Sequence, residues 1–499
     1  MTVPALLGLD IGSSSLKALL LSPQGVLLGE ASAPYPTHSP FPGAAEQDPQ
    51  AWWRAAGTAT RAALEAAGPV HVIGVGLSGQ MHTFVLLDAR GEPVRPAISW
   101  MDTRAAGLLP DLAERIDAAG LRDELANPVV VGLTLPPLRW LQLHEHAAIA
   151  AARSLLSAKD WLRYRLTGTI GSEPTDASAT LLFDVRRRRW SRATCDAFGL
   201  DPAILPELGD PLAAAGALTA DAAAHLGIDA GIPVAFGAGD AQAAALGMGS
   251  VAAGDAQLMV GTGAQPSVVL GEPPAGDPGR GLHAFCHVRG WLLQASINNA
   301  GSALGWARDL LGLDWDALYG ALGDEAPQAP LFLPYLTGER AGLVKGYARG
   351  GWLGLEPSHG RRDLAAAAVA GVVAGIAAGM ALLDRDDAAH VRAAGGGLRH
   401  TRFAQAVADA SGCTLEVREA GSASAVGAAL TGGVAAGLFA GLDEAVAHSP
   451  RHAAAVVRPR AERRAAWLAL RARLAALDGI GVHEHVRDVH MVRSPPASA

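Results

Sequence analysis

The chain has 499 residues, of which half are hydrophobic, 18% are charged and 60 are glycine. This length exceeds what one hydrophobic core supports, so we expect at least two compact domains and neither a disordered nor a fibrous protein. The net charge of -8 argues against nucleic acid and an anionic membrane surface as partners, because binding to either depends on clustered basic residues. A small-molecule partner fits better.

Cysteine usage and the N-terminus indicate a cytoplasmic protein. Cys195, Cys286 and Cys413 lie far apart without metal-ligand spacing, which predicts neither a disulfide framework nor a zinc site. The first residues lack the basic region and cleavage pattern of a signal peptide. The uncharged stretch Leu364 to Leu383 is long enough to cross a membrane, but it is mostly Ala and Gly, so we expect a buried helix.

The opening of the chain predicts an antiparallel meander. Apolar runs from Ala5 to Leu9 and from Leu16 to Leu21 flank a polar turn, and Pro23 to Gly25 lead into a third strand. Asp48 and Pro49 are a helix-start signal before the helical periodicity of residues 52 to 67.

A weaker copy of this opening spans Ala256 to Leu270, which implies two related halves. The Gly- and Ala-rich stretch from Gly231 to Gly249 could connect them, so we place a boundary near residue 248. After Pro450 the pattern is helical up to Leu477.

Both halves carry a glycine and hydroxyl turn suited to phosphate. The first runs from Asp10 to Lys17, where backbone N–H groups and serine hydroxyls can donate to phosphate oxygens and Asp10 can hold Mg²⁺. The second is Gly261 to Gly263, and Gly395 to Gly397 offer a third place where a nucleotide can approach the backbone. Each turn alone is also typical of an ordinary hairpin, but their pairing indicates a cleft that grips ATP from both sides.

Many short motifs in a shared order resemble the FGGY carbohydrate kinases, and most of all the xylulokinases among them. The resemblance covers about residues 6 to 430. It rests on Asp10 to Lys17, Gln47-Asp48-Pro49 with Trp52-Trp53, Ser78 to His82, Pro96-Ala97-Ile98 with Trp100 and Asp102, Gly132-Leu133-Thr134, Lys159-Asp160, Gly239-Asp240, Gly261 to Gly263, Gly338-Glu339-Arg340 and Gly395 to Gly397.

This resemblance implies an α/β fold of two ribonuclease-H-like (actin-like ATPase) domains with a cleft between them. Residues 1–247 would form the sugar-binding domain, residues 248–478 the nucleotide-binding domain, and residues 479–499 a flexible tail. It also implies a homodimer.

Asp240 would be the general base and Asp10 a second catalytic carboxylate, and both are candidates for holding Mg²⁺. Alternatively, Asp240 caps a helix that begins at Ala241. Gln80, Met81 and His82 would bind the sugar together with Asp240 and Gln242. Trp100 and Asp102 are weaker candidates, because surface salt bridging explains the charge near Arg104 as readily.

The nucleotide would be bound by loop glycines, hydroxyls and one lysine from both halves. These predicted ATP-binding residues are Gly12, Ser13, Ser14, Ser15, Lys17, Gly261, Thr262, Gly263, Gly301, Gly305, Gly396, Gly397 and Thr401.

Two departures from the xylulokinase pattern concern the sugar. Ala241 stands where Asn is usual, and Ala341-Gly342 replace Thr-Pro after the Gly-Glu-Arg motif. The substrate implied is D-xylulose, with another sugar, polyol or sugar acid such as ribulose, glycerol or gluconate as the alternative. A catalytically silent sugar and ATP sensor is the alternative from another class.

Overall fold

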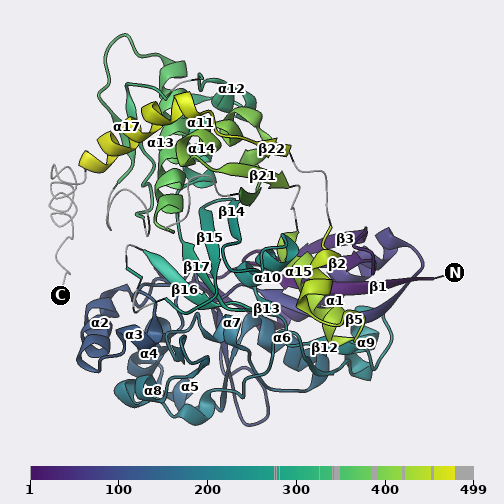
Figure 1. Cartoon of the computed structure of the whole chain (residues 1–499). Helices are drawn as coiled ribbons and strands as arrows, with labels where there is room; N and C mark the ends of the chain where they lie inside the picture. Colours follow the sequence, from purple (N-terminus) through teal and green to yellow (C-terminus); the bar gives the residue numbers. More distant parts are fainter. Residues whose placement is uncertain are drawn as a thin grey trace.

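The computed structural model describes residues 2–274, 276, 278–279, 281–324, 326–339, 341, 349–383, 390–418, 422–450 and 455–477. The predicted tail at 479–499, Arg340 of the Gly-Glu-Arg motif and Gly342 lie outside these residues. The described chain forms two lobes, each built on a mixed sheet with helices against it (Figure 1).

The sheet of the first half contains the predicted meander. Its strands run in the order β11 (Ala214–Ala217), β12 (Pro233–Ala235), β5 (Val70–Gly79), β1 (Val3–Ile11), β2 (Ser15–Leu21) and β3 (Leu27–Pro34), and β13 (Ala238–Gly239) also pairs with β5. β1, β2 and β3 are antiparallel as predicted, and β5 continues the sheet parallel to β1.

The second half repeats this arrangement. Its sheet has the order β16 (Leu282–Cys286), β17 (Trp291–Ala295), β15 (Ala264–Leu270), β14 (Ala256–Val260), β20 (His390–Ala394), β21 (Thr414–Arg418) and β22 (Ala455–Val457). β14 pairs antiparallel with β15 and parallel with β20, as β1 does with β2 and β5. The expectation of two related halves therefore holds, although β22 was not expected in a stretch that reads as helical.

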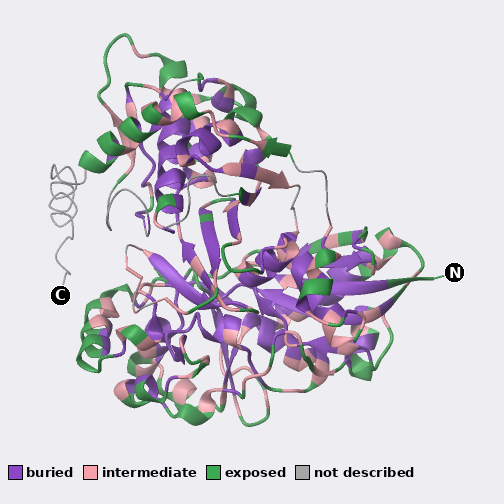
Figure 2. Cartoon of the chain, viewed as in Figure 1, coloured by how far each residue is buried: buried purple, intermediate pink, exposed green. Residues whose placement is uncertain are grey.

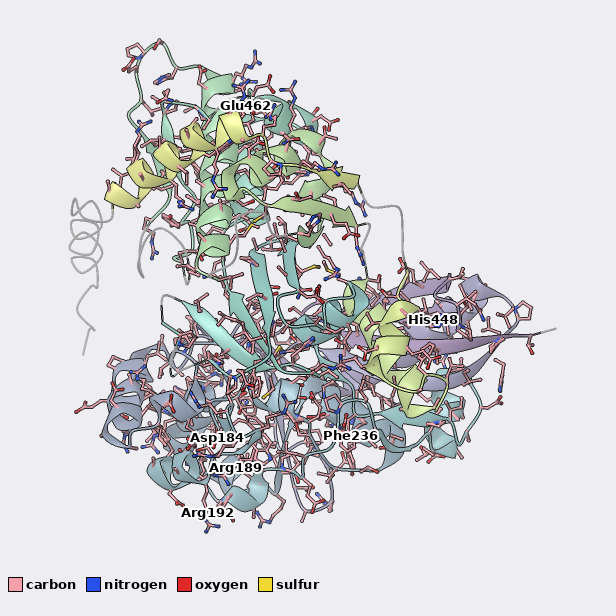
Figure 3. The ribbon with its side chains drawn as sticks, in the orientation of Figure 1. Asp184, Arg189, Arg192, Phe236, His448 and Glu462 are labelled. Carbon is pink, nitrogen blue, oxygen red and sulfur yellow. The ribbon has the colours of Figure 1, made fainter. Side chains whose placement is uncertain are left out.

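Smaller sheets complete the two lobes. One contains β4 (Glu46–Gln47), β7 (Ala97–Ile98), β6 (Phe84–Leu87) and β8 (Ser154–Ser157). The two-stranded ones are β9 (Phe183–Asp184) with β10 (Arg189–Trp190), and β18 (Leu331–Leu333) with β19 (Gly351–Leu353). Asp184 and Arg189, labelled in Figure 3, form an ion pair across the β9–β10 hairpin.

Most helices lie in the same half as their neighbours in sequence. In the first half these are α1 (Pro49–Ala67), α2 (Leu109–Ala118), α3 (Arg122–Leu125), α4 (Leu135–His144), α5 (His146–Ala151), α6 (Ala158–Thr167), α7 (Pro174–Ala177), α8 (Arg192–Phe198), α9 (Ala220–Leu226) and α10 (Asp240–Gly247). The later ones are α11 (Gly301–Leu311), α12 (Trp315–Gly320), α13 (Arg361–Ala381), α14 (Thr401–Ser411), α15 (Ala423–Ala435), α16 (Leu442–Ala447) and α17 (Ala461–Ala476). The 3-10 turns among the described residues are η1 (Ala106–Leu108), η2 (Pro202–Ile204) and η3 (Gly397–Arg399).

α1 and α13 confirm two sequence predictions, a helix start at Asp48-Pro49 and a buried apolar helix. Asp48 caps α1 by accepting the amide of Gln50, and Pro49 occupies the first turn, where its missing N–H costs nothing. α13 is long and apolar enough to span a membrane, but 83% of its most apolar window is buried inside the protein. Figure 2 shows it as a purple core helix of the second half, which confirms the expected buried helix.

The segment after β21 returns to the first half. α15 packs on β1 and β5 and against α10, although it follows the second-half strands in sequence (Figure 1). Glycine allows this close approach, because a Cβ atom on Gly76 would lie 1.7 Å from the carbonyl oxygen of Ala428 in α15. The predicted single boundary at residue 248 does not describe this segment, whose place is decided by packing.

Candidate active site

Three strand ends of the first half meet at one edge. β1 pairs with β5 so that Asp10 lies opposite Ser78, and β13 pairs with β5 so that Gly239 lies opposite Gly79. The strands are parallel, so their carboxyl ends share one edge, where parallel α/β sheets commonly bind ligands. Asp10 and Asp240 are thereby brought together from opposite ends of the first half.

Asp240 is half-buried and is the first residue of α10. The cap position belongs to Gly239, so the alternative of a helix beginning at Ala241 does not describe this end. Burial and the charge of Asp10 raise the pKa of Asp240 to about 7, while the backbone amides of Ala241 and Met81 lower it. A carboxylate with a pKa near neutrality suits general-base work.

Asp10 offers a site for a cation. Its Oδ1 is buried and has no hydrogen-bond partner among the described residues. Burial raises the pKa of Asp10, and the nearby Lys17 opposes this. No group of three or more acidic, His or Cys side chains that could together hold a metal ion occurs in the described parts of the chain. Mg²⁺ does not need one, because it keeps waters and binds substrate phosphate oxygens beside one or two carboxylates. Asp10 therefore fits Mg²⁺.

Met81 and His82 lie where the two halves touch. Met81 is buried in a small apolar cluster with Ala179 and Phe285, and Phe285 comes from β16 of the second half. His82 has a φ of 71°, which is uncommon for a residue with a side chain. Its Nδ1 lies 2.8 Å from the carbonyl oxygen of Ala179, and its ring is 5.8 Å from that of Phe285. Strained backbone of this kind clusters at functional sites.

Three other predicted sugar-binding residues donate hydrogen bonds to groups of the protein. Gln80 is buried and donates to Gln47 Oε1 at 2.7 Å. Trp100 is 36% exposed, and its indole N–H donates to Ser13 Oγ at 2.9 Å, which joins it to the first phosphate turn. Gln242 is fully buried, and its amide donates to the carbonyl of Cys286 at 3.1 Å, so it links α10 to β16.

Asp102 is engaged entirely by the protein. Its buried carboxylate accepts the Ala45 amide at 2.7 Å and the Arg104 Nε at 2.9 Å, and Arg104 also donates to Glu46 at 2.6 Å. The expected salt bridge exists, but it is buried instead of lying at the surface. Asp102 therefore holds Ala45 and Arg104 in place. That Asp102 also lines the sugar pocket stays a prediction.

The turn from Asp10 to Lys17, which the sequence predicts to contact phosphate, has the expected tight geometry. The Gly12 amide donates to the carbonyl of Ser15 at 3.0 Å, and the Tyr35 hydroxyl donates to the Gly12 carbonyl. Ser14 is exposed, and Ser13 and Ser15 are half-buried. Lys17 stands opposite Asp10 in the strand pair, so the turn combines hydroxyl donors with one cation and one carboxylate.

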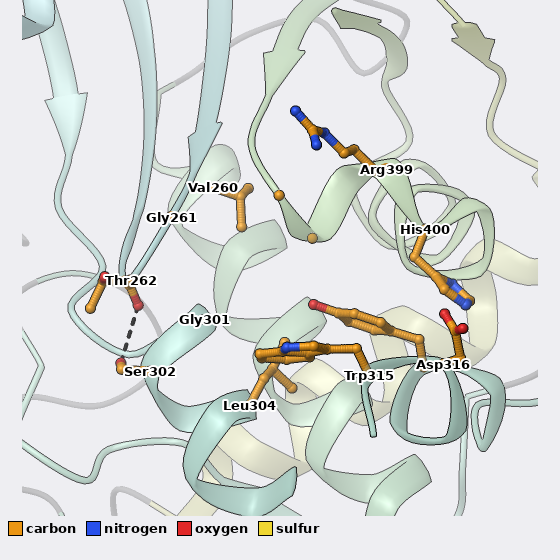
Figure 4. A pocket seen from close by; sticks show the side chains of 13 residues that line it. Val260, Gly261, Thr262, Gly301, Ser302, Leu304, Trp315, Asp316, Arg399 and His400 are labelled. Atoms are coloured by element: carbon orange, nitrogen blue, oxygen red, sulfur yellow. Dashed lines mark hydrogen bonds between the residues drawn. The ribbon is translucent and has the colours of Figure 1, made fainter. Parts of the chain in front are cut away.

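The second half contains a cavity of about 630 Å³ at the ends of β14 and β20 (Figure 4). Five predicted nucleotide residues line it, namely Gly261, Thr262, Gly301, Gly396 and Gly397. The loop is held by backbone bonds, with the Gly301 amide donating to the Gly261 carbonyl at 3.1 Å. The Ser302 hydroxyl donates to the Thr262 carbonyl at 3.1 Å, which is the dashed line in Figure 4.

The remaining predicted nucleotide residues lie elsewhere. Gly263 packs against the backbone of Ile297, and Gly305 faces Trp315 without lining the cavity. Thr401 lines a separate cavity of about 210 Å³ at the start of α14. None of Gly12, Ser13, Ser14, Ser15 and Lys17 is among the lining residues, so the structure keeps the first turn apart from this cavity.

Sequence reasoning missed the aromatic and charged wall of the cavity. Trp315 and Tyr319 stack with ring centroids 5.6 Å apart, and the ring of His400 lies 4.9 Å from that of Tyr319. Asp316 and Arg399 also line it. An aromatic pair four residues apart and the residues directly after a Gly-Gly-Gly turn were the signals available. Such a wall suits a flat heteroaromatic ring next to glycine loops for phosphates.

Fold and site together define a two-domain phosphotransferase with an actin-like architecture. The sequence profile of the FGGY family of carbohydrate kinases matches residues 5–247 with its N-terminal domain and residues 258–436 with its C-terminal domain. The chain belongs to this family, and it is a carbohydrate kinase.

Individual relatives cover nearly the whole chain. The xylulose kinase of Escherichia coli (strain K12) is 36% identical over 448 residues, which are 86% of this chain and 90% of that protein. A crystal structure named as a "xyloylose kinase" from Brucella ovis is 35% identical with a TM-score of 0.88, over 95% of this chain and 99% of the other. The gluconate kinase of Lactobacillus acidophilus superposes with a TM-score of 0.90 at 22% identity, over 97% and 100%, and so shows the fold alone.

Proposed function

We propose that the protein transfers the terminal phosphoryl group of ATP to D-xylulose and forms D-xylulose 5-phosphate and ADP. The observation that carries this proposal is the half-buried Asp240, whose Oδ1 accepts the backbone amide of Ala241 at 2.8 Å and whose pKa is raised by burial and by the charge of Asp10. Identity of about 35% with proteins named as xylulose kinases supports the choice of sugar.

The proposed reaction is an in-line transfer with Asp240 as base. A hydroxyl oxygen of the sugar attacks the terminal phosphorus, and its proton passes to the Asp240 carboxylate. The bond from that phosphorus to the bridging oxygen breaks, and ADP leaves with its electrons. Met81 and His82 would hold the sugar, because they adjoin Asp240 and include hydrogen-bonding and apolar groups.

ATP would lie in the cavity lined by Gly261, Thr262 and Gly396. Its base would stack near Tyr319, and its phosphates would point toward the glycine loops. Asp10 and Asp240 would hold Mg²⁺, which neutralises charge on the phosphate oxygens when bound. The turn at Gly12 to Ser15 would reach the phosphates only if the two halves close, as sugar kinases need in order to exclude water.

The alternatives are kinases for ribulose, gluconate or glycerol and a silent sensor. The retained Asp240 and Asp10 speak against a sensor. Ala241, which stands where xylulokinases usually have Asn, borders Met81 and Phe285. This difference from the xylulokinase pattern therefore lies next to the proposed sugar-binding residues. A cytoplasmic location, which cysteine usage and the N-terminus predict, and a homodimer, which the family resemblance implies, are part of the proposal.

The test is ADP release with Mg²⁺ and ATP across D-xylulose, D-ribulose, L-ribulose, glycerol, D-gluconate and no sugar. We expect the highest kcat/KM with D-xylulose and a loss of at least about 10²-fold in kcat for Asp240→Ala. Asp221→Ala is the matched control, because Asp221 is an exposed carboxylate in the first turn of α9. A different preferred sugar would overturn the substrate, and an active Asp240→Ala protein would overturn the base.

A further inference from the structure

A fully buried ion cluster lies behind the strand that leads to Asp240. Lys159 Nζ is 2.7 Å from Asp160, 3.2 Å from Glu173 and 3.8 Å from Asp176. Arg163 adds a second cation 2.8 Å from Asp160. Burying five ionisable groups is costly, and the cost is offset only where the groups satisfy one another's charges and hydrogen bonds. Nothing in the proposed reaction uses these groups directly.

The cluster is connected to the chain just before Asp240 in two ways. The first connection is to Phe236. Lys159 Nζ donates to the carbonyl of Phe236 at 3.4 Å, and Arg163 stacks over the Phe236 ring with 4.6 Å to its centroid. Phe236 is labelled in Figure 3, where it lies beside α6, the helix that carries Lys159 and Arg163. The segment from β12 to β13 is therefore anchored from one side by buried cations.

The second connection is a directed hydrogen-bond chain. The Thr175 hydroxyl donates to Glu173 Oε1 at 2.8 Å and accepts the Gly239 amide at 2.9 Å. A hydroxyl has only one proton, and a carboxylate can only accept while a backbone amide can only donate. The direction of the chain from Gly239 through Thr175 to Glu173 is thereby fixed. Gly239 immediately precedes Asp240 and is the cap residue of α10.

We infer that Glu173 and Thr175 are positioning residues, which hold the Gly239 amide and through it set the orientation of the Asp240 carboxylate. This inference rests on the proposed function in that Asp240 is taken as the base. Both residues are fully buried and act through Gly239. A carboxylate displaced by about 1 Å from the reacting hydroxyl can cost on the order of 10² in rate.

The test compares Thr175→Val with Thr175→Ser. Valine keeps the shape of threonine but removes the hydroxyl, whereas serine keeps the hydroxyl and removes a methyl group. We expect Thr175→Val to speed hydrogen exchange at the Gly239 amide and to lower kcat by about 10²-fold with KM for ATP unchanged. Thr175→Ser should retain kcat within about threefold. It should also keep the slow hydrogen exchange of the wild-type Gly239 amide. Thr175→Ala provides the same loss of the hydroxyl with less crowding if valine impairs folding.

Two results would overturn the inference. One is wild-type kcat in Thr175→Val despite faster exchange at Gly239, and the other is an equal loss of kcat in Thr175→Ser. Exchange at Gly239 does not depend on turnover, so it reports the hydrogen bond even if the proposed base is wrong. An active Asp240→Ala protein would mark that separate failure.

Discussion

The charge of Asp10, at the end of β1, acts on Asp240 at the start of α10. Parallel pairing of β1 and β13 with β5 brings the two carboxylates to one sheet edge, and burial and this charge raise the pKa of Asp240 to about 7. The free enzyme would therefore hold its base partly protonated at neutral pH.

A pH profile tests this relationship. A base must be ionised to accept a proton, so kcat/KM should fall tenfold per unit as pH drops below about 7. Asp10→Asn removes one of the influences that raise the pKa of Asp240, and the acid limb should move to lower pH even if overall activity falls. Asp221→Asn should leave the limb in place. An acid limb at the same pH in Asp10→Asn would contradict the coupling.

Asp176 should make stability depend on pH. Burial, together with the charges of Asp160 and Glu173, raises the pKa of Asp176 to about 8 despite the opposing Lys159. The folded state then binds more protons than the unfolded chain between about pH 4 and 8. The free energy of unfolding falls as pH rises through this window.

Asp176→Asn removes this titration. Relative to wild type, the variant should gain on the order of 2 kcal/mol in unfolding free energy between pH 6 and pH 8. Denaturant unfolding at several pH values measures the difference. The exposed Asp221→Asn should follow the wild-type slope, and parallel slopes for wild type and Asp176→Asn would show that Asp176 is ionised in the folded protein.

Two glycines in α13 give a matched pair for packing. A Cβ atom on Gly371 would lie 2.3 Å from the Phe332 carbonyl oxygen, whereas one on Gly375 has nothing within 4 Å. Gly371→Ala should destabilise by about 1 to 3 kcal/mol through overpacking, and Gly375→Ala should stabilise by up to about 1 kcal/mol through helix propensity. Thermal unfolding of both proteins decides this, and equal shifts would contradict the packing argument.

Gly396 tests the nucleotide cavity without disturbing the fold. It has helical φ and ψ angles, lines the cavity, and has open space where a Cβ atom would stand. Gly396→Leu should raise KM for ATP at least about tenfold, because the new side chain occupies the space proposed for the nucleotide, and KM for the sugar should change little. Gly107→Leu, at an exposed glycine that also has open space, controls for the substitution itself. An unchanged KM for ATP would place the nucleotide elsewhere.

Local sequence patterns were sufficient to predict individual strands and helices, the two related halves and the family. Apolar runs broken by Gly and Ser predicted β1, β2 and β14, and Asp48-Pro49 predicted the start of α1, because these signals act over a few residues. The sequence also selected Asp240, Asp10 and five glycine-loop residues of the cavity. Each of these residues lies beside a turn or strand end, and such places can be recognised in the sequence by their Gly-, Ser- and Thr-rich composition.

Which distant groups come into contact depends on tertiary packing and could not be predicted from local patterns. α15 returns to β1 and β5, Trp315 and Tyr319 form the cavity wall, and Glu173 reaches Gly239 through Thr175. The carboxylate of Asp102 bonds to Ala45 and Arg104, which residue type alone did not indicate. The Nε2 of Gln242 donates to Cys286, whereas its Oε1 is buried without a partner among the described residues, and the substrate roles of both residues stay predictions. Sequence patterns report what a residue can bond to, whereas packing across the sheet edge and between the halves determines which partner it finds.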